Sequence, residues 1–401
     1  MNQLRSTLKN RALRHLLAAQ LPADFADWLD FVAVGALLAF TWKAEPIIFA
    51  FLAVCLGLPY LIVGPIAGVL VDRSHIKLVL IGSNLGRAVV TFAFVFAPNW
   101  QALLALVLLR SSIDAFFTPA KQAAIQAIVA PDSRMAANGA SHAINQASKI
   151  VAPALGGALL IGLTPQNVFF LNGIVSIVAA AVLLGLPHIE RHSGDDTSNG
   201  SVRANIKGGF AEIANNSRLR GALTLMAGGY FAMFFYDTLI APLIRDMGFD
   251  GTGLGMTLAA VGAGGVVGAL WLGGKDISRP FLWIAFGGAI SGLTVVTIGL
   301  AEALSIGLPF YAFVALFAIV GASSAMSVVP VRTVIQNETS PGRIASVTAL
   351  GEAANTAALL TAPFLGALIA SVFSIGIAFV VGGALLVAIA GVALMLQRGG
   401  D

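Results

Sequence analysis

The sequence predicts an all-α membrane protein with twelve transmembrane helices, and three observations support this fold class. Of the 401 residues, 58% are hydrophobic and 10% are charged, whereas a soluble domain has about 45–50% and about 25%. The mean hydropathy of +0.89 arises from a series of long apolar stretches, each near the ~20 residues that cross a bilayer. The 44 glycines suit closely packed membrane helices, because a glycine lets two backbones approach.

The apolar stretches are separated by short segments rich in proline, glycine or charge. A polar segment around residues 188–216 divides the chain near its midpoint. We therefore expect a six-helix bundle over 1–187, a cytoplasmic linker over 188–217 and a second six-helix bundle over 218–401. The predicted spans lie near residues 14–42, 46–71, 77–97, 100–120, 135–162 and 166–187, and then near 219–244, 252–274, 280–301, 305–331, 342–370 and 373–397.

The basic residues predict the orientation of the chain. With both termini in the cytoplasm, the inside segments hold eighteen of the 23 lysines and arginines, and the outside loops hold only Lys43 and Arg245. Cytoplasmic loops of membrane proteins carry such an excess, so the net charge of +4 reflects topology and not nucleic-acid binding. Asp24, Asp27 and Asp30 interrupt the first apolar stretch, which favours a retained helix over a cleaved signal peptide.

Other function classes lack support in the sequence. Cys55 is the only cysteine, which excludes a disulfide scaffold. The sequence has no H-E-x-x-H or C-x-x-C pattern, no Walker motif and no nucleophile elbow. We therefore expect no enzyme activity, no metal and no cofactor, and a transport cycle would draw on an ion gradient.

The two halves of the sequence resemble each other at an offset near 210 residues. Pro119-Ala-Lys121 recurs as Pro330-Val-Arg332, and Ala152-Pro153-x-x-Gly156 recurs as Ala362-Pro363-x-x-Gly366. Matching prolines and loop cations in the same order indicate a duplication of six helices. In parallel repeats of this kind the substrate site lies near the middle of the bilayer, between the halves.

The stretch Gly68-Val-Leu70-Val-Asp72-Arg73-Ser-His75-Ile76-Lys77 resembles the G-x-L-a-D-r-x-G-r-k signature of the major facilitator superfamily. His75 and Ile76 depart from the signature. The resemblance implies the twelve-helix major facilitator fold. We expect Gly68 to allow close helix packing, and Asp72 to face cations and the N-terminus of the eleventh helix, where Ser340 is the expected N-cap. The predicted cytoplasmic gate consists of Gly68, Asp72, Arg73, Lys77, Arg134 and Arg343.

A second resemblance, to the drug-exporter branch that includes macrolide efflux proteins, covers most of the chain. The segment from Leu109 to Ala120 resembles the fourth helix of that branch. The fifth helix follows the spacing of the antiporter signature g-x8-G-x3-G-P-x2-G-G, with Ser148 and Ala152 in place of two glycines. The positions that carry this resemblance are Gly139, Ser148, Pro153, Gly156 and Gly157.

Two other groups of transporters share features with the chain. Ala19-Gln20 and Phe25-Ala26-Asp27, with Pro119-Ala-Lys121, also resemble bacterial lysophospholipid transporters. Siderophore exporters share the pattern from Gln336 to Gly351. These resemblances leave more than one substrate class open.

Charged side chains within membrane spans are costly and are usually paired or functional. Asp27 in the first helix and Asp237 in the seventh are candidate proton carriers, each with a structural alternative as a capping or pairing acid. Arg110 and Asp114 lie four residues apart and are expected to pair on one helix face. The predicted proton-coupling and substrate-cavity residues are Asp27, Asp30, Asp237, Arg110, Asp114, Lys149 and Glu352, and Glu352 suits a gate equally well.

These observations predict a proton-coupled exporter of amphipathic organic compounds, drug-like or siderophore-like, that works by alternating access. We expect a monomer in the lipid bilayer of the bacterial cytoplasmic membrane, with a small amphipathic substrate and no nucleic-acid partner. The alternative is a lysophospholipid flippase or transporter. A third hypothesis, a non-transporting membrane sensor or scaffold, leaves the gate and antiporter patterns without a use.

Overall fold

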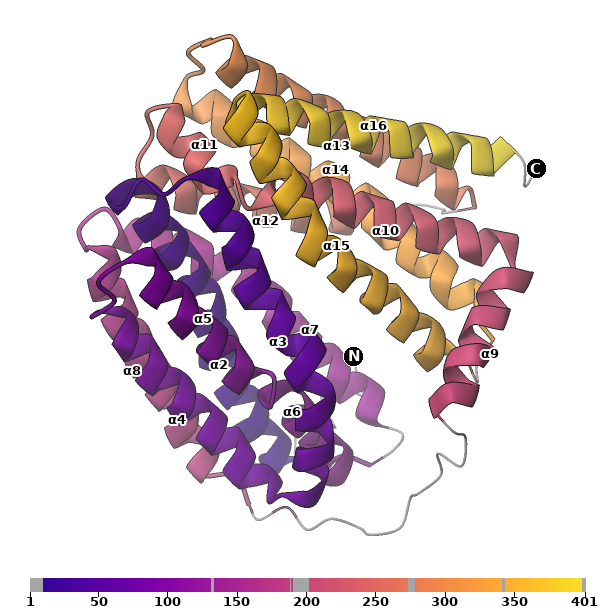
Figure 1. Ribbon diagram of the computed structural model, residues 1–401. Helices are drawn as coiled ribbons and strands as arrows, with labels where there is room; N and C mark the ends of the chain where they lie inside the picture. Colours follow the sequence, from indigo (N-terminus) through magenta and orange to yellow (C-terminus); the bar gives the residue numbers. More distant parts are fainter. Residues whose placement is uncertain are drawn as a thin grey trace. The chain divides into compact units, whose positions relative to one another are not determined.

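The computed structural model describes residues 10–130, 133–187, 189, 202–272, 278–340 and 343–398, and within these ranges all regular structure is helical (Figure 1). The chain forms two compact units. The first comprises Met1–Ala44, Val54–Asp195 and Asp250–Met256, and the second comprises Glu45–Ala53, Asp196–Phe249 and Thr257–Asp401.

The N-terminal half of the chain supplies the helices that form most of the first unit. Asn10 caps the first of them, because its side-chain oxygen accepts hydrogen bonds from the backbone N–H groups of Ala12 and Leu13 at 2.9 and 3.2 Å. The helices are α2 (Arg11–Ala36), continued by the π-helix η1 (Leu37–Thr41), α3 (Pro46–Arg73), α4 (Ile76–Phe94), α5 (Trp100–Asp114), α6 (Phe117–Ile128), α7 (Arg134–Leu159) and α8 (Pro165–Leu184).

The C-terminal half supplies the helices of the second unit in the same way. Asn216 caps α10 by accepting from the backbone N–H groups of Arg218 and Leu219. The helices are α9 (Val202–Asn215), α10 (Ser217–Asp237), α11 (Ile240–Asp246), α12 (Gly251–Leu272), α13 (Pro280–Ala303), α14 (Phe310–Glu338), α15 (Ile344–Val372) and α16 (Ile375–Arg398).

The prediction of twelve spans is confirmed. Ten segments of the described chain are long and apolar enough to cross a membrane, with α5 and α6 forming one span and α10 and α11 another. The remaining two predicted spans are α2 with η1 and α7, helices of 26 residues each whose polar and charged side chains lower their hydropathy. The chain is therefore a multi-pass membrane protein.

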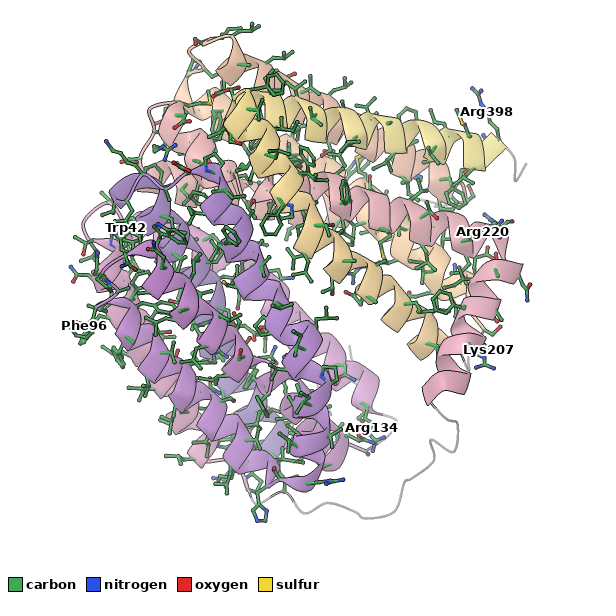
Figure 2. All side chains as sticks on the ribbon, in the orientation of Figure 1. Trp42, Phe96, Arg134, Lys207, Arg220 and Arg398 are labelled. Carbon is green, nitrogen blue, oxygen red and sulfur yellow. The ribbon has the colours of Figure 1, made fainter. Side chains whose placement is uncertain are left out.

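The labelled basic residues of each unit lie near one end of its helices (Figure 2). In the first unit, Arg134 lies at the opposite end from Trp42 and Phe96. In the second unit, Arg220 and Arg398 lie at the same end. This arrangement within each unit fits the charge pattern of the sequence.

The predicted linker is partly helical. Residues 188 and 190–201 lie outside the described part of the chain, whereas 202–215 form α9. Within the second unit, Glu212 of α9 accepts hydrogen bonds from Ser340, which the sequence did not suggest because the two residues lie 128 positions apart.

Candidate functional site

A cluster of charged side chains lies inside the first unit, where α2, α4 and α5 each present two polar residues on one face. Asp27 and Asp30 are three residues apart on α2, Arg87 and Thr91 are four apart on α4, and Arg110 and Asp114 are four apart on α5. Because residues three or four apart share a helix face, each pair points toward the same neighbours. We call Asp27, Asp30, Arg87, Arg110 and Asp114 the charged cluster.

Asp27 connects both arginines of the charged cluster. Its Oδ1 atom accepts a hydrogen bond from Nη2 of Arg87 and lies 2.8 Å from Nη2 of Arg110. Arg87 Nη2 also donates to the backbone carbonyl of Ala23 at 2.8 Å. One carboxylate on α2 therefore ties that helix to both α4 and α5.

Asp30 and Asp114 each bind one of the two arginines. Arg110 Nε lies 2.8 Å from Asp30 Oδ2, and Arg87 Nη1 lies 2.8 Å from Asp114 Oδ1. The Tyr60 hydroxyl on α3 donates a hydrogen bond to Asp114 Oδ2. The structure thus replaces the predicted Arg110–Asp114 pair: the two residues share a helix face, but each ion-pairs with a residue of a neighbouring helix.

Burial distinguishes Asp27 from the rest of the charged cluster. The Arg87 side chain is fully buried, those of Arg110, Asp30 and Asp114 are 5–9% exposed, and that of Asp27 is 30% exposed. With all five groups ionised, the cluster holds three negative and two positive charges. The most accessible acid is also the one that both arginines share.

A second polar group joins α2 to α7. Gln20 Nε2 donates to Asp24 Oδ2 at 2.7 Å and to the Ser141 carbonyl at 2.9 Å, and Ser141 Oγ donates to Gln20 Oε1 at 2.7 Å. Asn145 donates to the same Asp24 oxygen at 3.3 Å. The side-chain amides of Gln20 and Asn145 therefore both donate to Asp24, and this polar group links α2 to α7.

The other predicted cavity residues lie outside the charged cluster. Lys149 on α7 is exposed, with Nζ 5.5 Å from the centroid of the Trp28 ring, a cation–π geometry. Asp237 is half-buried at the end of α10. Glu352 on α15 is exposed and accepts a hydrogen bond from Asn355 at 3.4 Å.

The predicted gate residues have varied environments. A methyl group at Gly68 would meet no atom within 4 Å, so the close packing expected at Gly68 is absent from this structure. Asp72 lies in α3, but its side chain is outside the described part of the chain. Arg73, at the end of α3, is exposed.

Two predicted gate cations bind the carboxyl ends of helices. Lys77 Nζ donates to the carbonyls of Leu184 and Leu186 at 2.8 and 2.6 Å. Arg134 donates to the carbonyls of Val129 and Gln126 at 3.3 and 3.0 Å. Terminal carbonyls have no partner within their helix and attract cations, so both side chains have a structural role in addition to any role in a gate.

The start of α15 differs from the prediction. The helix begins at Ile344 with Arg343 at the N-cap, and Ser340 is not its cap. Instead, Ser340 donates its Oγ–H and N–H to Oε1 of Glu212 on α9, at 2.6 and 3.1 Å. These hydrogen bonds lower the pKa of Glu212 below its ordinary value. The guanidinium of Arg343 packs beside Gly208, also on α9.

The helix that was predicted to be of antiporter type is α7. Gly156 faces α2, because a methyl group there would lie 2.9 Å from the Leu29 side chain. Ser148 is buried and Pro153 lies within the helix, whereas Gly139 borders open space. The small residue Gly156 therefore permits close approach of α2 and α7, and Gly157 packs against the backbone of Gly255.

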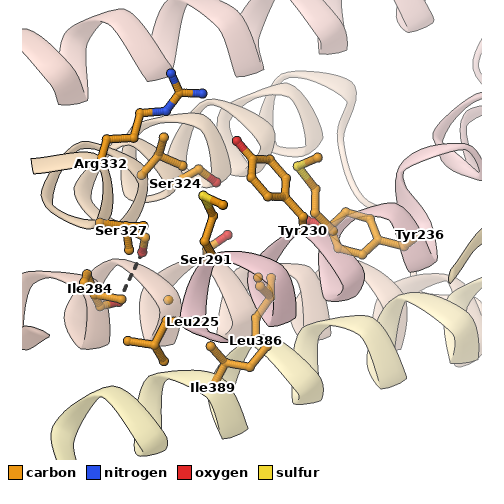
Figure 3. A pocket seen from close by; sticks show the side chains of 16 residues that line it. Leu225, Tyr230, Tyr236, Ile284, Ser291, Ser324, Ser327, Arg332, Leu386 and Ile389 are labelled. Carbon is orange, nitrogen blue, oxygen red and sulfur yellow. Dashed lines mark hydrogen bonds between the residues drawn. The ribbon is translucent and has the colours of Figure 1, made fainter. Parts of the chain in front are cut away.

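A pocket lies within the second unit (Figure 3). It contains about 720 Å³ of space free of protein atoms, part of it open to the outside. Four helices each contribute one face to it, as the spacing of the lining residues shows. The residues are Leu225, Met226, Gly229, Tyr230, Met233 and Tyr236 of α10, Ile284, Gly288 and Ser291 of α13, Ser324, Ser327, Val328, Val331 and Arg332 of α14, and Leu386 and Ile389 of α16.

The sequence analysis missed several residues of both sites. Arg87 was visible as a charge within a span, which is the signal that could have placed it in the cluster. Tyr60 gave no such signal, because tyrosine is uncharged and is frequent in membrane helices near the membrane–water interfaces. The repeat did mark Arg332 and its counterpart Lys121. Lys121 is buried, with Nζ 5.6 Å from the centroid of the Phe117 ring.

The fold and the charged cluster together define a class of protein. A multi-pass helical membrane protein with two helical units and buried ionised side chains fits a membrane transporter. No group of three or more His, Cys, Asp or Glu side chains in the described residues is arranged to hold a metal ion. The sequence model of the Major Facilitator Superfamily matches residues 16–351, and the chain belongs to this family of transporters.

Individual proteins show the same relationship. The chain is 27% identical over 394 residues to the uncharacterized MFS-type transporter YfiS of Bacillus subtilis (strain 168), covering 97% of this chain and 94% of YfiS. It is 27% identical over 354 residues to macrolide efflux protein A of Streptococcus pyogenes, covering 85% of each. A bacterial homologue of the iron transporter ferroportin in an inward-facing state has the same fold, with a TM-score of 0.72, 17% identity, and coverage of 96% of this chain and 98% of that one.

Proposed function

We propose that this protein exports amphipathic organic compounds by proton antiport, and that Asp27 binds the proton. The observation that carries this proposal is the position of Asp27, which contacts both buried arginines and is the most exposed acid of the charged cluster. A coupling residue needs both properties. It must be reached by protons, and its protonation must change contacts between helices.

The charge balance of the cluster supports a single proton. When Asp27 is neutral, Arg110 still pairs with Asp30 and Arg87 still pairs with Asp114. The cluster then contains two matched ion pairs and no net charge. Proton binding therefore weakens the link from Asp27 to α4 and α5 without leaving an unpaired buried charge, which would cost several kcal/mol.

Such a change biases the conformational equilibrium. A ligand shifts an equilibrium only by its differential affinity for the two states, and the proton meets this requirement if the two arginine contacts of Asp27 differ between states. Asp237, half-buried on α10, is the corresponding candidate acid of the second unit. The predicted gate and the antiporter-type helix α7 fit the same cycle.

The direction and substrate class rest on other grounds. The relative named macrolide efflux protein A matches most of the chain, and the sequence has no nucleotide-binding motif to power transport. The charge pattern favours a cytoplasmic location for both termini, in the cytoplasmic membrane of a bacterium. We propose that the protein works there as a monomer.

The proposal is tested with purified protein in proteoliposomes, with erythromycin as the probe and a pH-sensitive dye inside. Wild-type protein should move protons when erythromycin is added. An imposed pH gradient should drive the accumulation of erythromycin against its own concentration gradient. Asp27→Asn should abolish gradient-driven accumulation and retain exchange of labelled for unlabelled erythromycin, because the amide keeps the shape but cannot cycle a proton.

The control is Asp246→Asn, which changes an acid that lies next to Arg245 at the end of α11. It should behave as wild type in both assays. Full gradient-driven accumulation by Asp27→Asn would refute the coupling role. Loss of exchange together with accumulation would show that Asp27 serves substrate binding or folding instead.

A further inference from the structure

The pocket of the second unit has a chemical character of its own. Most of its lining is apolar, including Met226, Met233, Leu386 and Ile389. About 720 Å³ of space free of protein atoms lies among the lining residues, and part of it is open to the outside. Methionine is unbranched and adapts its shape to different apolar partners. The pocket is therefore suited to a flexible hydrocarbon group.

Few of the residues that line the pocket are polar, and among these described residues Arg332 alone carries a charge. Arg332 is exposed and makes no ion pair or hydrogen bond to any residue that the structure describes. No acidic side chain lines the pocket. A guanidinium without a carboxylate beside it favours an anionic group and disfavours a cationic one.

The serines extend this polar region. Ser327 Oγ donates to the Ile284 carbonyl at 3.1 Å, the interaction drawn in Figure 3. Ser291 and Ser324 have no hydrogen-bond partner within the described ranges. Their hydroxyls are available to the oxygens of a bound head group. Figure 3 shows Arg332 at one side of the pocket and Tyr236 at the other.

We infer that this pocket binds a single-chain amphiphile with an anionic head group, taken from the membrane. The hydrocarbon chain would lie against the apolar lining, and the phosphate or carboxylate would meet Arg332. The site belongs to the second unit and contains no member of the charged cluster, so this inference does not depend on proton antiport. It also differs from the proposed export of a drug-like compound, because the ligand is defined by its negative charge.

The glycines of the pocket supply a clean test. A methyl group at Gly229, which lines the pocket, would meet no atom within 4 Å. Gly229→Leu therefore directs a large apolar side chain into the pocket from a position where its Cβ has room. Gly391 on α16 also borders open space but does not line the pocket, so Gly391→Leu is its matched control.

The experiment uses full-length protein in phosphatidylcholine nanodiscs and a lysophosphatidylglycerol whose acyl chain carries a diazirine. After irradiation, mass spectrometry of peptides should place the label on α10 or α16, which carry the apolar side chains of the pocket. Unlabelled lysophosphatidylglycerol should compete at least about tenfold better than lysophosphatidylcholine of the same chain, which corresponds to about 1.4 kcal/mol. Inorganic phosphate alone should not compete, because the chain supplies most of the contact.

Five variants decide the outcome. Arg332→Gln should bring the ratio of the two lipids close to one, whereas Arg332→Lys and the exposed-arginine control Arg398→Gln should keep it. Gly229→Leu should lose the labelling that Gly391→Leu retains. An unchanged ratio in Arg332→Gln, or unchanged labelling in Gly229→Leu, would overturn the inference. Competition by phosphate alone would also overturn it, in favour of a simple anion site.

Discussion

The pairing of Asp114 with Arg87 gives a sharp test of the charged cluster. The two side chains are 9% and 0% exposed, and their atoms lie 2.8 Å apart. Arg87→Gln leaves Asp114 with Tyr60 as its remaining partner. Removing one partner of a buried ion pair typically costs about 3–5 kcal/mol. We therefore expect this loss in the free energy of unfolding, and a smaller one for Asp114→Asn.

Two double-mutant cycles separate the structural pairing from the one that sequence spacing suggests. For residues in direct contact, coupling energies run from about 0.5 to 3 kcal/mol, and we expect the Arg87–Asp114 cycle to give about 1–3 kcal/mol. The Arg110–Asp114 cycle should give at least about 1 kcal/mol less, because Arg110 contacts Asp27 and Asp30.

The measurement is equilibrium unfolding in mixed micelles, followed by tryptophan fluorescence. The Arg218–Glu338 pair, 3.5 Å apart with Arg218 51% exposed, is the control and should couple by less than about 1 kcal/mol. If Asp114 couples more strongly to Arg110 than to Arg87, the pairing described here is wrong.

Two further predictions concern packing and the linker helix. Gly156→Leu should destabilise the protein by about 1–3 kcal/mol through overpacking against Leu29. The control Gly139→Leu should not, because Gly139 borders open space. Equal melting temperatures for the two variants would contradict the α2–α7 contact. Because the pKa of Glu212 is lowered, its contact with Ser340 should contribute stability at neutral pH and be lost as the pH falls below the ordinary value of about 4.3. Protection from hydrogen exchange at the start of α15, corrected for the intrinsic pH dependence of the exchange rate, should therefore fall in acid and in Glu212→Gln. Protection that does not change with pH in the wild type would rule this out.

The fold was predictable because hydropathy depends on composition over ~20 residues, and a few polar positions do not hide it. Even α2, which carries Asp24, Asp27 and Asp30, is predicted as a membrane span, because apolar residues surround the three aspartates in the sequence. The ends of spans were less accurate. For example, the fourth span continues to Ile128 through α6, because the helix restarts at Phe117 after a short turn.

The members of the charged cluster were partly predictable, but their pairing was not. Spacing along one helix shows which residues share a face, so Arg110 and Asp114 were expected to meet. It does not show which helix lies opposite, and the buried Arg87 on α4 takes Asp114. The same limit applies to Ser340, where local sequence predicts a cap and the distant Glu212 accepts its hydrogen bonds instead.

The repeated cation, Lys121 in the first half and Arg332 in the second, has a different environment in each half. Lys121 is buried beside the Phe117 ring, whereas its counterpart Arg332 borders a pocket. The position four residues before Arg332 holds Val328, which cannot offer an aromatic face. With the ligand inferred above, the cation of the first half would serve internal packing, and the cation of the second half would serve ligand binding. Val328→Phe would thus place an aromatic ring four residues before Arg332, as Phe117 lies four residues before Lys121.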